Sequence, residues 1–319
     1  MGIGERIRKD DDNKIAILKE GKKNKIESIV FVAEEPQYSL NDIILPQDIK
    51  EKILDIAEYA ENSKIVFEDW GLQKTHRQSK RVGINLYGDP GTGKTMAAHA
   101  IARYLNRKIV IVNYADIESK YVGETPKNIC KAFDFAKETK SILFFDEADA
   151  ILSKRVKNMS SATDVSVNQT RSVLLMLLNE YQDFIIFATN FIENFDPAFM
   201  RRISMHVRFK LPDKKCRELL WRKYTPDTMP HNIDFEEISE KYDGISGSDI
   251  SNAILTAAFK VARRKGNCVE KKYIFEAIED IINSKRANDN NEDIKKKKVS
   301  EEYVYEQIEK IKKKEDEKQ

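Results

Sequence analysis

The chemistry of this 319-residue chain is indicated first by residues 88–95, which read GDPGTGKT and match the pattern G-x-x-x-x-G-K-[ST] at every position. In this pattern the glycines let the backbone curl so that successive N–H groups point at phosphate oxygens. Lys94 supplies a positive charge to the same phosphates, and the Thr95 hydroxyl is a ligand for Mg²⁺. A buried strand is predicted over residues 82–87 and a helix over 94–105, so the loop meets a helix N-terminus. The sequence therefore predicts a site for a nucleoside triphosphate with Mg²⁺.

Two further strands end in polar side chains suited to hydrolysis. Residues 142–146 form an apolar run that ends in Asp146 and is followed by Glu147, and residues 184–189 form another that is followed by Asn190. We expect Asp146 to hold the Mg²⁺ shell, Glu147 to polarise a water molecule and Asn190 to orient it. Taken alone, the acidic pair is compatible with a solvated turn and Asn190 with a turn former. Their positions downstream of Lys94 favour the catalytic interpretation.

Two adjacent arginines, Arg201 and Arg202, follow a short helix predicted just after Asp196-Pro197. They are compatible with a solvated helix end. The alternative is that they act as arginine fingers, which reach the γ-phosphate held by a neighbouring subunit. The second interpretation requires an oligomer.

The elements that must position these residues alternate along the chain. Short apolar runs separated by helical patterns predict an α/β fold, a parallel sheet covered by helices on both faces. After residue 211 the strand patterns stop, which predicts a small all-α domain. We expect an extension at 1–37, an α/β domain at 38–211, the helical domain at 212–285 and a charged tail at 286–319. The predicted strands are 84–87, 108–113, 142–146, 184–189 and 205–210, with a strand-like run at 26–33. The predicted helices are 47–61, 94–105, 214–224, 234–241, 248–264 and 271–284, then a linker at 288–293 and a final helix at 300–314.

Composition narrows the class of protein. The hydrophobic fraction is 41%, the charged fraction 34% and the net charge +2. No apolar run approaches the roughly 18 residues needed to cross a bilayer, and the N-terminus leads into charge rather than an apolar signal segment. The three cysteines are odd in number and widely spaced, which is typical of neither a disulfide framework nor a metal site. We therefore expect a cytoplasmic protein with no membrane partner, and the nearly balanced charge argues against a nucleic-acid partner.

From about Tyr38 to Ser284 the chain resembles the AAA family of AAA+ ATPases. The resemblance rests on five ordered motifs: GDPGTGKT at 88–95, FFDEAD at 144–149, FATN at 187–190, DPAFMRR at 196–202 and GISGSDI at 244–250. It implies an ATP hydrolase with an α/β P-loop domain and an α-helical lid, assembled as a homohexameric ring.

The resemblance also implies site residues. Gly247 and Ser248 begin a lid helix whose first turn is expected to contact the adenosine part of the nucleotide. Ile43 and Ile44 match the segment whose backbone groups bracket adenine. The family usually has a second arginine three residues after the first, where this chain has Ser204. Either Arg202 substitutes for it or a single finger serves. The expected nucleotide contacts are Ile43, Ile44, Asp89, Pro90, Gly91, Thr92, Gly93, Lys94, Thr95, Met96, Gly247 and Ser248.

Lys120, Tyr121 and Val122, followed by Gly123, occupy the place of a family pore loop. An aromatic ring offers sequence-tolerant contact with a polypeptide, although aromatic residues are also often buried. Residues 154–169, polar and without a core pattern, are expected to form a second pore loop. We expect a ring motor that unfolds or disassembles a protein substrate chosen by the extension, the tail or an adaptor protein. The alternatives are a nucleotide-gated scaffold that threads nothing and, less favoured, a nucleic-acid-associated ATPase.

Overall fold

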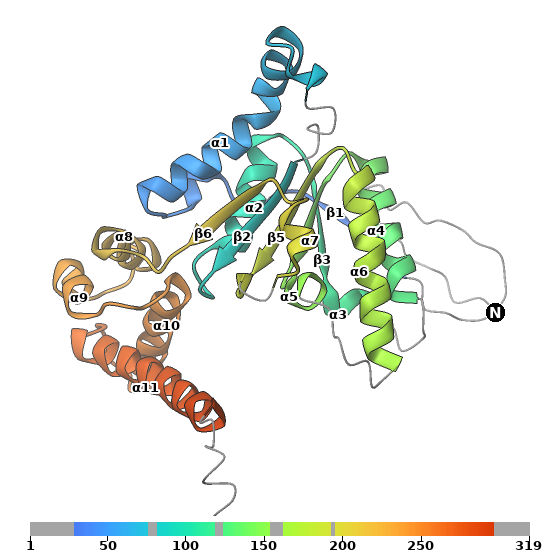
Figure 1. The fold of residues 1–319 in the computed structure, drawn as a ribbon. Coiled ribbons are helices and arrows are strands. Elements are labelled where there is room, and N and C mark those ends of the chain that lie inside the picture. Colours follow the sequence, from blue (N-terminus) through green and yellow to red (C-terminus); the bar gives the residue numbers. More distant parts are fainter. Residues whose placement is uncertain (1–28, 76–81, 119–123, 154–161, 193–194, 297–319) are drawn as a thin grey trace, which may run out of the picture. The chain divides into compact units, whose positions relative to one another are not determined.

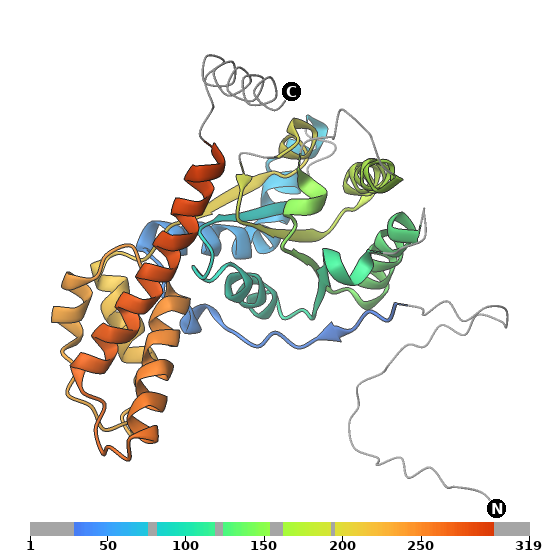
Figure 2. The same ribbon diagram turned by 90° about the horizontal axis from the view of Figure 1, so that it is seen from below.

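The computed structural model describes residues 29–75, 82–118, 124–153, 162–192 and 195–296. The chain divides into two compact units, Met1–Lys210 and Leu211–Gln319, and each is described by itself. Among the described residues, no helix is both long and apolar enough to span a bilayer. Figures 1 and 2 show the ribbon from two directions.

The first unit contains a six-stranded sheet in the order β1-β3-β4-β5-β2-β6. Each pairing is parallel except that of β1 with β3. The predicted α/β fold with a parallel sheet is therefore confirmed. The strand-like run expected at 26–33 is met in part: among its described residues, 29–33, only Ala33 belongs to a strand, β1. The strands are β1 (Ala33–Glu34), β2 (Val82–Gly88), β3 (Ile109–Asn113), β4 (Ile142–Asp146), β5 (Phe184–Thr189) and β6 (Met205–Phe209).

Helices cover both faces of this sheet, and α4 and α6 lie side by side on one of them (Figure 1). A single-turn helix, η1 (Leu40–Asp42), precedes α1; a π-helical turn, η2 (Ile65–Asp69), and a 3₁₀ turn, η3 (Leu72–Lys74), follow it. The segment 154–169 was expected to be a loop, but its described part from Ala162 onward is the start of α6. The α-helices are α1 (Gln47–Lys64), α2 (Lys94–Tyr104), α3 (Tyr114–Ile117), α4 (Glu124–Thr139), α5 (Asp149–Leu152), α6 (Ala162–Glu180) and α7 (Pro197–Met200).

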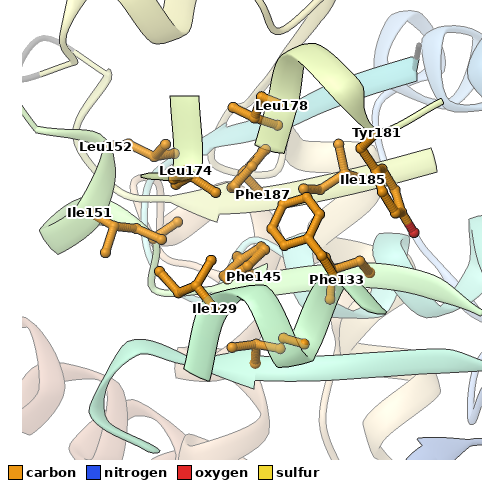
Figure 3. Packing of buried hydrophobic residues seen from close by; sticks show 14 of the residues in the cluster. Ile129, Phe133, Phe145, Ile151, Leu152, Leu174, Leu178, Tyr181, Ile185 and Phe187 are labelled. Carbon is orange, nitrogen blue, oxygen red and sulfur yellow. The ribbon is translucent and has the colours of Figure 1, made fainter. Parts of the chain in front are cut away.

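The core has two halves, one on each face of the sheet. Successive side chains of a strand point to opposite faces, so Phe144 packs with α1 and α2 whereas Phe145 packs with α4 and α6. On the latter face Phe145 stacks on Phe187 at a centroid distance of 5.4 Å, and the Phe133 ring meets Tyr181 edge-on at 5.1 Å (Figure 3). This double burial explains why the β4 and β5 sequences are continuous apolar runs.

The second unit is helical, with α8 (Lys214–Tyr224), α9 (Phe235–Lys241), α10 (Gly247–Arg263) and α11 (Lys271–Lys296) (Figure 2). Carboxylates or hydroxyls of Asp213, Asp234 and Ser246 accept backbone N–H bonds at three helix starts. The linker predicted at 288–293 was wrong, because α11 continues through it. Asn and Asp are weak helix formers, but each costs well under about 1 kcal/mol, and neither Gly nor Pro interrupts the segment. The helix predicted at 300–314 lies outside the described residues.

Candidate nucleotide-binding and hydrolysis site

The phosphate-binding loop connects the end of β2 to the start of α2, as predicted. Two of its glycines are required by the backbone. A Cβ on Gly88 would lie 2.0 Å from the carbonyl oxygen of Phe209 at the end of β6, so no other residue fits there. Gly93 precedes α2 in the left-handed region, with φ of 98°, a conformation that glycine adopts without steric cost. The loop curvature that cradles phosphates is thus built into the chain.

Lys94 lies inside this loop. Its side chain is buried, and its Nζ donates hydrogen bonds to the carbonyl oxygens of Gly88 at 2.8 Å and Asp89 at 2.9 Å. Burial lowers the pKa of Lys94 from its ordinary value, and the negative charge of Asp146, followed by that of Asp149, opposes the shift. The ammonium group is therefore held within electrostatic reach of the carboxylates of Asp146, at the end of β4, and Asp149.

The two nucleotide motifs meet through Thr95 and Asp146. The Thr95 hydroxyl donates to Asp146 Oδ2 at 2.9 Å, although 51 positions separate the two residues. Hydroxyl and carboxylate oxygens are ligands that Mg²⁺ prefers, and Mg²⁺ typically takes only one or two protein ligands beside water and phosphate. Within the described ranges, no group of three or more His, Cys, Asp or Glu side chains forms a separate metal cluster. The residues present therefore fit Mg²⁺ bound together with a nucleotide.

Glu147 is exposed at the end of β4 in an uncommon backbone conformation, with φ of 49°. The left-handed region costs a non-glycine residue about 1 kcal/mol, and such strain is characteristic of functional sites. The Glu147 N–H donates to its neighbour's carboxylate, Asp146 Oδ1, at 2.9 Å. The Ala148 N–H then bonds to the Ala188 carbonyl of β5 at 2.9 Å. These bonds hold the turn that carries Glu147 against the adjacent strand.

Asn190 directly follows β5, and β5 pairs with β4 in the sheet. Asn190 therefore lies at the same end of the sheet as Asp146 and Glu147, where the carboxyl ends of these parallel strands meet, as the sequence predicts. Its backbone N–H points at the carboxylate of Asp149, a residue that our sequence reasoning did not single out. Asp149 is the last residue of the FFDEAD motif, and this third carboxylate was the available signal.

The structure distinguishes the two candidate fingers by their contacts. Arg202 is half-buried and donates to Asn179 Oδ1 of α6 at 2.9 Å and to the Ala198 carbonyl of α7 at 2.8 Å. Arg201 is exposed at the end of α7, and its Nε makes a longer contact of 3.3 Å with the Pro197 carbonyl. The hydroxyl of Ser204, which stands where the family has an arginine, donates to the Gly83 carbonyl at 3.1 Å. Of the two candidates, Arg201 is thus the one whose side chain is less engaged within its own unit.

The other expected nucleotide contacts occupy several places. Ile43 is buried in the core beside α1 and α2, with Ile44 half-buried next to it. Gly247 and Ser248 form the first turn of α10 in the second unit, after the capping residue Ser246. In the loop, Asp89, Pro90 and Gly91 are exposed, Thr92 donates to the Asp89 carbonyl at 2.7 Å, and Met96 packs against the core. The pore residues Lys120, Tyr121 and Val122 lie outside the described residues.

Comparisons with known proteins agree with this geometry. The model of the family described as "ATPase family associated with various cellular activities (AAA)" matches residues 84–211, and that of the AAA+ lid domain matches residues 232–276. A proteasome-activating nucleotidase of Saccharolobus islandicus is 32% identical over 276 residues, covering 84% of this chain and 68% of that protein.

Two further relatives come from other organisms and carry other names. The 26S proteasome regulatory subunit 8 homolog of Schizosaccharomyces pombe is 30% identical over 292 residues, covering 87% of this chain and 69% of that protein. Cell division protein C of Sulfolobus acidocaldarius is 29% identical over 248 residues, covering 73% and 62%. With its P-loop, the acidic strand end beside it and these matches over most of its length, the chain belongs to the AAA family and is an ATPase.

Proposed function

We propose that this ATPase couples hydrolysis of Mg²⁺-bound ATP to the remodelling of a protein substrate in the central pore of a homohexameric ring. The observation that carries the proposal is the meeting of Thr95 and Asp146 beside the P-loop in a chain of this family. Relatives named as a proteasome-activating nucleotidase and a proteasome regulatory subunit support a protein substrate. Substrate choice is assigned to the terminal segments or to an adaptor protein.

We assign the hydrolytic roles as follows. Lys94 and the loop N–H groups bind the β- and γ-phosphates, while Thr95 and Asp146 hold Mg²⁺. When bound, Mg²⁺ neutralises phosphate charge and orients the γ-phosphoryl group. The Glu147 carboxylate takes a proton from the attacking water, whose position is set by the Asn190 side chain.

Completion of the site is assigned to a neighbouring subunit. Arg201 is the proposed finger, since its guanidinium is exposed while that of Arg202 is engaged with α6 and α7. Since Ser204 stands where the family usually has a second arginine, we propose that Arg201 acts as a single finger. Within the first unit, we propose that Ile43 and Ile44 contact the adenosine moiety; the contact of Gly247 and Ser248 stays a prediction from the family resemblance.

The first experiment measures ATPase rate and molar mass together, by light scattering with ATP, for the wild type and Glu147→Gln. We expect a hexamer in both cases, with turnover in the wild type and retained ATP in the variant. Glu138→Gln, the same chemical change on the exposed face of α4, is the matched control and should behave as wild type. A monomer without turnover would refute the ring motor and favour a nucleotide-gated binding module.

Threading is tested separately at Tyr121. We propose that Lys120, Tyr121 and Val122 contact the translocating polypeptide. Tyr121→Ala should retain basal ATPase activity but lose its stimulation by a permanently unfolded probe, such as carboxymethylated casein. Tyr121→Phe, which keeps the ring, should retain stimulation. Equal stimulation of Tyr121→Ala and wild type would contradict threading.

A further inference from the structure

The third carboxylate of the FFDEAD motif has its own set of contacts. Asp149 is half-buried at the first residue of α5, three positions after the end of β4. Its carboxylate accepts the Asn190 N–H, at 3.3 Å to Oδ1 and 3.2 Å to Oδ2, and the Phe191 N–H at 3.2 Å to Oδ1. One side chain thus accepts hydrogen bonds from two consecutive peptide groups 41 and 42 positions later in the chain.

These peptide groups lie where β5 ends. The pairing of β5 with β4 ends at Phe187, and leaving the half-buried N–H of Asn190 without an acceptor would be costly. The Asp149 carboxylate supplies that acceptor with a negative charge, which strengthens hydrogen bonds from N–H donors. The bond from the Ala148 N–H to the Ala188 carbonyl, one residue before Asp149 and two residues before Asn190, ties the same two segments. The turn after β5 is therefore held to the turn after β4 at two successive points.

The two joined turns carry the residues assigned to water activation. Glu147 lies two positions before Asp149, and Asn190 is itself one of the residues whose N–H it accepts. Fixing the peptide N–H fixes the local backbone of Asn190, and the direction of the Cα–Cβ bond follows from the backbone. A side chain that must be aligned for in-line attack loses rate when misplaced by about 1 Å.

We propose that Asp149 is a positioning residue for ATP hydrolysis, which acts through Asn190 by holding the backbone from which that side chain projects. The inference rests on the proposed function, specifically on the role of Asn190 in orienting water. Asp149→Asn keeps the size of the side chain and one acceptor oxygen, but it removes the negative charge and the second acceptor oxygen, which weakens the bonds from both N–H groups.

The test is a double-mutant cycle on the full-length protein with ATP. The variants are Asp149→Asn, Asn190→Ala and their combination, and Asp134→Asn on the exposed face of α4 is the matched control. We measure kcat, ATP affinity and thermal unfolding. Asp149→Asn should lower kcat about 10- to 100-fold, as loss of an orienting partner typically does, while ATP affinity changes by less than about threefold. Because Asp149 acts through Asn190, the double variant should be no slower than Asn190→Ala alone.

Each alternative outcome is distinct. If Asn190→Ala is impaired but Asp149→Asn keeps wild-type kcat, the positioning role is refuted and the proposed function stands. If the two losses multiply in the double variant, Asp149 does not act through Asn190. If Asn190→Ala itself hydrolyses at the wild-type rate, the proposed role of Asn190 fails and the inference fails with it. Should Asp149→Asn not fold, the same cycle is run with Asp149→Glu, which keeps the charge but displaces the carboxylate by one methylene.

Discussion

Arg201 and Arg202 are adjacent residues of the same type, yet we expect their replacement by alanine to affect different properties, the rate of hydrolysis for Arg201 and the stability of the fold for Arg202. Arg202 bonds to Asn179 and to the Ala198 carbonyl, whereas Arg201 is exposed and has one long contact with Pro197. Arg202→Ala should therefore lower the stability of the fold and Arg201→Ala should lower the rate of hydrolysis.

The magnitudes follow from these contacts. A hydrogen bond from a charged group contributes about 1.5–3 kcal/mol, but Arg202 is only half-buried, and solvent reduces the value. We expect Arg202→Ala to lower the free energy of unfolding by about 1–2 kcal/mol. Arg201→Ala should cost less than about 0.5 kcal/mol, as is usual for surface positions. A finger acting in trans changes kcat by about 10³- to 10⁵-fold in other nucleotide hydrolases, which is about 4–7 kcal/mol of activation free energy.

The assays are urea unfolding for stability and steady-state kcat for hydrolysis, with Arg103→Ala, an exposed arginine at the end of α2, as the control. Mixing Arg201→Ala with Glu147→Gln adds a direct test of action in trans. In mixed rings an Arg201→Ala subunit keeps its own Glu147 and meets an intact Arg201 on its neighbour, so activity should return. An Arg201→Ala protein with wild-type kcat, or mixed rings without recovered activity, would refute the single finger in trans.

Three further predictions concern stability. Thr189→Val leaves the fully buried Asn85 amide without its 3.4 Å hydroxyl donor and should lower the free energy of unfolding in urea by about 1 kcal/mol, whereas adding Asn85→Leu should recover it. Arg107→Lys loses the two-pronged pairing with Asp183 at 2.6 and 2.7 Å and should cost about 2 kcal/mol in the same assay, with kcat nearly unchanged. Burial lowers the pKa of His99 below its ordinary 6.5. The contribution of His99 to stability is therefore complete above about pH 6.5 and is lost as the pH falls toward the folded-state pKa. His99→Gln should make the free energy of unfolding vary less with pH between 7 and 5.

The outcomes that would contradict these predictions are equally specific. If the double variant at positions 85 and 189 is less stable than Thr189→Val, packing rather than the orphaned amide sets the cost. If Arg107→Lys unfolds at the wild-type urea concentration, the charge alone suffices. His206, whose pKa burial also lowers, adds a dependence of the same sign, so a pH profile unchanged by His99→Gln would assign the effect to His206 instead.

Much of the fold could be predicted because local patterns encode it. The strands β4 and β5 are continuous apolar runs because both faces are covered, and the predicted bounds agree with the observed ones. The helix α8 begins and ends where the sequence predicts, since Asp213 supplies a cap at its start. The error at residues 288–293 arose because Asn and Asp are frequent in linkers, although their helix propensity is only moderately unfavourable.

The sequence by itself was enough to predict the chemistry of the site: a lysine, a hydroxyl and carboxylates at spacings typical of a nucleotide site with Mg²⁺, each at the end of a strand or the start of a helix. Backbone preferences and hydrophobic periodicity depend on neighbouring residues, so they can be read locally. Only the tertiary structure decided that β5 lies between β2 and β4, that Asp149 holds the turn of Asn190, and that Arg202 is engaged while Arg201 is exposed. Such contacts join residues tens of positions apart, and packing of the whole domain, rather than any local pattern, selects them.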